Sequence, residues 1–107
     1  LASPESNRGY LAVGRELTNE AAPDLKESFE IGHEAEAAFP NQWPREELPA
    51  FRETMLAYFR EANALHLDVL RGVALGLGLE EEYFTPRCDG NHQNLRLLRY
   101  PRCWNAE

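Results

Sequence analysis

The stretch PAFRETMLAYFREANALHLDVLRGVALGLGL, residues 49–79, decides the fold of this chain. Apolar side chains recur in it at steps of three and four residues, which is the spacing of an amphipathic helix. Pro49 suits a first helical position, and Gly76 and Gly78 loosen the far end. The pattern therefore predicts one long helix over residues 49–79.

Two apolar stripes run along this helix. They consist of Phe51, Met55, Tyr58, Ala62, Leu65, Val69 and Val73 on one face and Leu56, Phe59, Leu67, Leu70, Ala74 and Leu77 on the other. In residues 62–79 only Asp68 and Arg71 are charged, so this half is apolar nearly all round and is expected to be buried on more than one side. That burial asks for more protein than 107 residues supply, and the first residue is Leu1. We therefore expect a piece of a longer chain.

Composition and charge exclude several classes of function. With 43% hydrophobic and 27% charged residues, the chain has the composition of a globular protein with a core, long enough for one domain. A formal net charge of −7 argues against nucleic acid as a partner, because phosphate binding requires clustered Lys and Arg. The sequence contains neither a run of about twenty apolar residues nor a basic leader, so no membrane association is expected and a cytoplasmic location is predicted.

The remaining segments are short. We expect extended pieces at residues 10–13 and 25–31, closed by Gly14 and Gly32, and a loop over residues 33–49. A helical turn is expected at residues 80–84, stopped by Pro86.

A final strand is predicted over residues 93–100. Alternation in this strand places Leu95 and Leu97 on one face. The opposite face is expected to carry Asn94, Arg96, Leu98 and Tyr100.

None of the candidate metal ligands has a convincing spacing. His66-Leu67-Asp68 matches a His-x-Asp pattern, but residues two apart on a helix point to nearly opposite sides and cannot grip one ion. Cys88, His92 and Cys103 lack a fourth ligand and the paired spacing of structural zinc. The two cysteines are therefore expected to be reduced thiols.

Six blocks of sequence carry a resemblance to the isopenicillin N synthase-like family of non-haem iron(II) oxygenases, most of which depend on 2-oxoglutarate. In order along the chain they are Arg8-Gly9-Tyr10, Lys26-Glu27-Ser28-Phe29-Glu30-Ile31-Gly32, Asn41-x-Trp43-Pro44, Leu48-Pro49-x-Phe51-Arg52, Ala74-Leu75-x-Leu77-Gly78-Leu79 and Leu95-Arg96-Leu97-Leu98-Arg99-Tyr100-Pro101.

The resemblance implies an α+β chain, an incomplete segment of a double-stranded β-helix, or jelly roll, dominated by one long helix. Residues 1–48 would end the family's amino-terminal region, residues 49–85 would form the supporting helix and a helical turn, and residues 86–107 would begin the β-helix core.

The implied chemistry needs iron(II) and 2-oxoglutarate, and it oxidises a small organic substrate by hydroxylation or desaturation. Its iron is held by a His-x-Asp…His triad, which the resemblance places beyond residue 107. This chain alone is therefore expected to bind no metal and to be inactive.

The resemblance also implies a pocket for cosubstrate or substrate. Tyr100 aligns with a tyrosine that holds 2-oxoglutarate in related plant enzymes, and Arg96 and Asn94 share its predicted face. Arg8 and Tyr10 belong to a segment that borders the substrate entrance in this family. Packing alone would also explain Tyr100 and Tyr10.

Two other classes remain open from the sequence. The apolar half of the helix suits a non-catalytic interaction module that associates with itself or with another chain. A small metal-binding domain is the third alternative, and metal-independent folding would exclude it.

Overall fold

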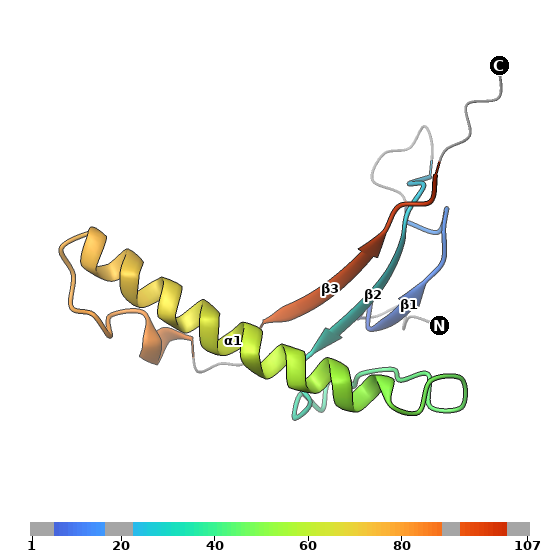
Figure 1. Cartoon of the computed structure of the whole chain (residues 1–107), viewed down its shortest axis with the longest axis horizontal. Helices are drawn as coiled ribbons and strands as arrows, with labels where there is room; N and C mark the ends of the chain where they lie inside the picture. Colours follow the sequence, from blue (N-terminus) through green and yellow to red (C-terminus); the bar gives the residue numbers. More distant parts are fainter. Residues whose placement is uncertain (1–5, 17–22, 89–92, 103–107) are drawn as a thin grey trace, which may run out of the picture. The chain divides into compact units, whose positions relative to one another are not determined.

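A computed structural model of the chain describes residues 6–16, 23–88 and 93–102 (Figure 1). In chain order its elements are β1 (Gly9–Leu11), β2 (Glu27–Gly32), α1 (Phe51–Gly76), the 3₁₀ helix η1 (Thr85–Arg87) and β3 (Asn94–Arg99). They fall into two compact units, a sheet unit of Leu1–Gln42 with Asn94–Glu107 and a helical unit of Trp43–Gln93. The α+β class predicted from the sequence is confirmed.

The three strands form one antiparallel sheet in the order β1-β2-β3. β3 lies beside β2 in the sheet, as Figure 1 shows, although about sixty residues separate the two strands in the sequence. The register pairs Glu30 with both Gly9 and Arg96, and Gly32 with Asn94. Residues near both ends of the chain therefore pair with the central strand, β2.

The predicted strands exist, but their ends differ. β1 begins at Gly9 and stops at Leu11, because the chain already turns at Ala12, whose carbonyl accepts from the Arg15 amide at 3.2 Å. β2 includes Gly32 as its last residue instead of being closed by it, since Gly32 pairs with Asn94.

β3 ends one residue before Tyr100, because β2 begins at Glu27, opposite Arg99. No residue of β2 is left to pair with Tyr100. The predicted inclusion of Tyr100 in the strand is therefore wrong.

The two sheet faces differ in character. One carries Phe29, Ile31, Leu95 and Leu97, and Ile31 is buried with 1% of its surface exposed. The other face carries Glu30 and Gly32 of β2 and Asn94, Arg96 and Leu98 of β3. The alternation predicted for residues 94–98 is confirmed, and it creates a polar face whose geometry is described below.

Helix α1 confirms the long helix predicted over residues 49–79. It begins two residues later and ends three residues earlier than predicted. Pro49 precedes it, and the Thr54 amide and hydroxyl both donate to the Ala50 carbonyl, at 3.2 and 3.1 Å. At the other end Gly78 has φ +71°, the left-handed conformation that glycine adopts without strain. The Leu79 amide donates to Ala74 and the Gly78 amide to Leu75, which is a Schellman motif.

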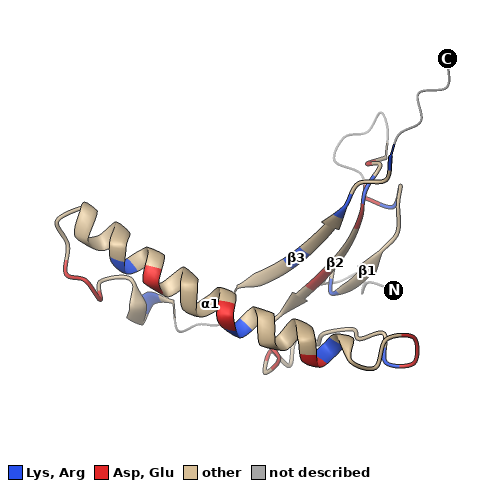
Figure 2. Ribbon diagram, in the orientation of Figure 1, with Lys and Arg blue, Asp and Glu red and all other residues tan. Residues whose placement is uncertain are grey.

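Much of the apolar surface of α1 is exposed. Met55 and Ala74 are its buried residues, whereas the exposed apolar side chains include Tyr58, Leu65, Val69, Val73 and Leu75. Figure 2 shows that the last turns of the helix carry no charged residue. Among the residues that the structure describes, there is no helix whose length and hydropathy would suit a membrane span.

The prediction of a helical turn at residues 80–84, after α1, is wrong. That stretch is a turn, and the helical piece is η1, in which Pro86 occupies the first turn. Proline is tolerated there because amides in a first turn have no intrahelical partner. Arg71 ties this segment to α1, since its Nε donates to Glu82 and its Nη1 to Asp68, both at 2.7 Å.

Candidate functional site

Arg8 is held in a tight turn before β1. Asn7 has φ +56° and Gly9 has φ +106°, so the backbone is left-handed on both sides of Arg8. Only 9% of the Arg8 side chain is exposed. Its Nη1 donates to Asn94 Oδ1 at 2.7 Å and lies 3.7 Å from Glu30 Oε1. Two residues that are 86 positions apart, Arg8 and Asn94, therefore meet on the polar face.

Glu30 is the centre of this face. Its side chain is 8% exposed, and its Oε2 accepts from Arg96 Nε and Nη2, each at 2.6 Å. Two nitrogens of Arg96 thus converge on one carboxylate oxygen in a charge-assisted contact, which is stronger than a hydrogen bond between neutral groups. The hydrogen bond to Glu30 raises the pKa of Arg96 above its usual value.

The ion pairs continue beyond Arg96. Arg96 Nη1 reaches Glu16 at 3.2 Å, and Lys26 Nζ lies 3.3 Å from Glu16 and 2.9 Å from Asp24. Hydrogen bonding to Asp24 raises the pKa of Lys26. Basic and acidic side chains therefore alternate in this group, in the order Arg96, Glu16, Lys26 and Asp24.

The position of the Arg8 side chain leaves no room for a side chain at Gly32. A Cβ on Gly32 would lie 2.1 Å from Arg8 Nη2 and 2.3 Å from its Cζ. Asn41 fixes the Gly32 peptide from the other side, because its Oδ1 accepts from the Gly32 amide and its Nδ2 donates to the Gly32 carbonyl, each at 2.9 Å. The arginine therefore occupies the volume that any other side chain at position 32 would need.

Replacing Gly32 by alanine is expected to push the Arg8 guanidinium away from Asn94 and to lower the free energy of unfolding by about 1–3 kcal/mol, the cost of overpacking a buried site. Denaturant unfolding of the intact protein, meaning the full product of the gene that encodes these residues, measures the loss. Gly72→Ala is the matched control, since nothing lies within 4 Å of its added Cβ. Equal stability of the two variants would contradict this role of Gly32.

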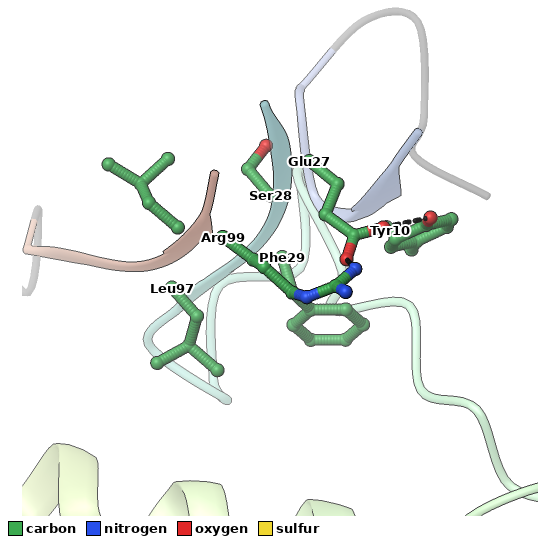
Figure 3. Close-up of a pocket in the computed structure, with 7 residues that line it drawn as sticks. Tyr10, Glu27, Ser28, Phe29, Leu97 and Arg99 are labelled. Carbon is green, nitrogen blue, oxygen red and sulfur yellow. Dashed lines mark hydrogen bonds and ion pairs between the residues drawn. The ribbon is translucent and has the colours of Figure 1, made fainter. Parts of the chain in front are cut away.

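Tyr10 lies on the opposite face of the sheet, in a second polar group (Figure 3). Its hydroxyl donates to Glu27 Oε2 at 2.6 Å, and Arg99 Nη1 donates to Glu27 Oε1 at 2.5 Å. These side chains border a shallow hollow of about 170 Å³, lined by Tyr10, Glu27, Ser28, Phe29, Leu97, Leu98 and Arg99.

The Tyr10–Glu27 contact predicts a pH dependence. The hydrogen bond to Glu27 raises the pKa of Tyr10, and the same bond, followed by the one from Arg99, lowers the pKa of Glu27. The stabilising contribution of Glu27 is therefore present above its ordinary pKa and is lost as the pH falls through the lowered value. That of Tyr10 is present below its ordinary pKa and is lost as the pH rises through the raised value.

A tyrosinate absorbance titration of the intact protein, with Tyr10→Phe subtracted, measures the pKa of Tyr10. We expect Glu27→Gln to shift that midpoint to lower pH. A midpoint that does not move would show that the bond to Glu27 does not hold in solution.

The structure brings together three of the five residues singled out in the sequence. Arg8, Asn94 and Arg96 share the polar face with Glu30. Tyr10 is on the other face, and Tyr100 follows β3 with 67% of its surface exposed. Sequence reasoning missed Glu30, Gly32 and Asn41 as parts of this site, although all three lie in the blocks that carry the resemblance.

The described residues do not fit an iron centre. In residues 6–16, 23–88 and 93–102 no three His, Cys, Asp or Glu side chains are grouped so as to hold a metal ion. His66 and Asp68 are exposed on α1, and Asp68 is paired with Arg71. Cys88 is a free thiol, whereas His92 and Cys103 lie outside the described residues.

Similar proteins are oxygenases. The proline hydroxylase buaE of Petromyces alliaceus is 36% identical over 104 residues, which are 92% of this chain and 33% of that protein. The 2-oxoglutarate-dependent dioxygenase ecdK of Aspergillus rugulosus is 34% identical over 92% of this chain and 34% of its own length. No family model matches the chain.

The fold agrees with these relatives. A full-length Neurospora crassa protein, solved in complex with alpha-KG, which is 2-oxoglutarate, matches with a TM-score of 0.79 and 46% identity. The match covers 92% of this chain and 33% of that one. The chain belongs to the non-haem iron(II), 2-oxoglutarate-dependent oxygenases. The chain spans about a third of the length of the curated relatives it matches.

Proposed function

We propose that this chain is a segment of an enzyme that oxidises a small organic substrate while 2-oxoglutarate is decarboxylated to succinate. The observation that carries the proposal is the match of 92% of the chain, in fold and in sequence, to the Neurospora crassa protein solved with alpha-KG. Another structure of that protein holds thymine together with alpha-KG, and its match covers 94% of this chain at 43% identity. Those matches support a segment of the jelly-roll fold, with the described sheet as part of it.

In this proposal the polar face of the sheet forms one wall of the substrate pocket. Asn94 and Arg96 project from β3, and Arg8 reaches the same face from the turn before β1. The position of Tyr10 at the entrance of that pocket stays a prediction. Iron(II) and 2-oxoglutarate, when bound, supply the oxidising chemistry, and the residues of the polar face position the substrate.

Turnover by the intact protein tests the proposal. Purified protein with iron(II), ascorbate, oxygen and 2-oxoglutarate should form succinate, slowly without substrate and faster with a productive one. Omitting iron(II) or 2-oxoglutarate should abolish succinate formation. Succinate formation that is absent under all these conditions, together with no binding of 2-oxoglutarate, would overturn the proposal.

Tyr100→Phe probes the cosubstrate contact that the resemblance implies. The phenol is exposed, and no described residue bonds to it. If its hydroxyl orients a carboxylate of 2-oxoglutarate, removing it should raise the apparent KM for 2-oxoglutarate about tenfold, the cost of one hydrogen bond to a charged group. Tyr83→Phe, in the helical unit, is the control. Unchanged kinetics in Tyr100→Phe would remove Tyr100 from the pocket.

An interaction module is the second candidate function, favoured by the exposed apolar side chains of α1. Leu65 and Val69 are 64% and 55% exposed in this chain. Size-exclusion chromatography with light scattering separates the two functions. A compact, cooperatively melting assembly of the 107-residue chain would favour a module, and a molten or aggregated state would favour an oxygenase segment.

A further inference from the structure

The polar face carries two arginines, and both are already paired with Glu30. Arg96 directs Nε and Nη2 at Glu30 and Nη1 at Glu16. Arg8 is closed off from solvent, with 9% of its side chain exposed, and lies over Gly32. Each guanidinium is therefore paired with a protein carboxylate, and Nε of Arg8 is buried without a hydrogen-bond partner.

The formal charges of this group cancel. Three basic residues are joined by contacts of 3.7 Å or less to three acidic ones, namely Arg8, Arg96 and Lys26 with Glu30, Glu16 and Asp24. Glu30 is the least exposed of the carboxylates, at 8%. An incoming carboxylate would have to displace Glu30 from two arginines, leaving a buried charge without its partners.

Asn94 offers an uncharged hydrogen-bond donor on the face. Asn94 Oδ1 accepts from Arg8, which fixes the amide orientation and leaves the Nδ2 group as a donor. Asn94 is exposed, and no described residue accepts from its Nδ2. A carbonyl oxygen of an amide, imide or ketone is the acceptor that suits this uncharged donor.

We propose that the polar face selects a neutral substrate with a carbonyl acceptor, bound through Asn94 Nδ2, and that Glu30 is the specificity residue that rejects anions. This inference rests on the proposed function, because it takes the polar face to line the substrate pocket. Discrimination arises from repulsion as much as from attraction, since Glu30 both occupies the arginines and repels a second carboxylate.

The same arrangement keeps 2-oxoglutarate out of the substrate side. A dianion attracted to free Arg8 or Arg96 would compete with the substrate. With Glu30 in place, the arginines are neutralised and that competition is removed. In this proposal Glu30 separates the substrate from 2-oxoglutarate by charge.

Benzamide and benzoate test the proposal, because they have nearly the same shape and differ in charge. Each is titrated anaerobically into the intact protein already loaded with iron(II) and 2-oxoglutarate, so that the cosubstrate position is filled. We expect wild-type protein to bind benzamide about tenfold more tightly than benzoate. Glu30→Gln should reduce this ratio about tenfold by freeing Arg96 for benzoate.

Two further variants keep the test decisive. Glu27→Gln makes the same change on the same strand but on the other face, so the benzamide to benzoate ratio should stay as in wild type. Asn94→Asp preserves the acceptor for Arg8 and removes the donor, so benzamide binding should weaken about tenfold while benzoate stays weak. Asn94 is exposed, so this variant answers even if Glu30→Gln fails to fold.

Three outcomes would overturn the inference. They are a wild-type protein that binds benzoate as tightly as benzamide, a folded Glu30→Gln variant with an unchanged ratio, and a wild-type protein that binds neither probe. Succinate formation from 2-oxoglutarate is measured on the same samples. Its persistence in any of these cases would leave the proposed function intact.

Discussion

Replacing Glu30 by alanine is expected to lower the free energy of unfolding of the intact protein by about 3 kcal/mol. The carboxylate is 8% exposed and lies between Arg8, itself 9% exposed, and Arg96, which is 37% exposed. Removing one partner of a buried ion pair costs about 3–5 kcal/mol because the other charge is left uncompensated. Water can reach Arg96, which places the expected value at the low end of that range.

Urea unfolding of wild type and Glu30→Ala measures this effect. Glu27→Ala is the matched control, because Glu27 sits on the same strand and also pairs with an arginine, but both partners are more open to solvent. We expect a clearly smaller loss for Glu27→Ala. Equal losses in the two variants would show that burial of the Glu30 network is not what stabilises the sheet.

Introducing a charge at Leu65 is the second large effect. Leu65 is 64% exposed in this chain, but it belongs to the half of α1 that is apolar nearly all round. If the rest of an oxygenase covers that surface, Leu65→Glu buries an unpaired carboxylate and should cost the intact protein about 3 kcal/mol or more.

Leu65→Met separates charge from shape in this test. It keeps an apolar side chain of similar volume and should cost less than about 1.5 kcal/mol in the intact protein. Thermal and urea unfolding of both variants provide the comparison. A Leu65→Glu protein as stable as wild type would mean that this stretch of α1 faces water, and the interaction module would then become the better account.

The sequence predicted the long helix well because two independent signals agree there. The apolar spacing runs through Phe51–Gly76, and Gly78 supplies the left-handed residue that ends the helix. The 3₁₀ helix η1 was missed because Pro86 was interpreted as a helix stop, whereas it occupies a first turn. Local spacing cannot distinguish these two uses of proline.

The candidate site was only partly visible in the sequence. Alternation in β3 placed Asn94 and Arg96 on one face, and the structure confirms that these two residues share a face. The role of Glu30 depends on register, since Arg8 and Arg96 reach it from positions 22 residues before and 66 residues after it. The Asn41 contacts with Gly32 depend on how a loop folds back, which no periodicity encodes.

An anaerobic iron(II) titration in the presence of 2-oxoglutarate tests the account most directly. We predict that the intact protein binds one equivalent of iron(II) tightly and that the isolated 107-residue chain binds none, because its described residues offer no group of three ligands. One tight equivalent on the isolated chain, or none on the intact protein, would contradict the claim that these residues form one wall of an oxygenase whose metal is held elsewhere.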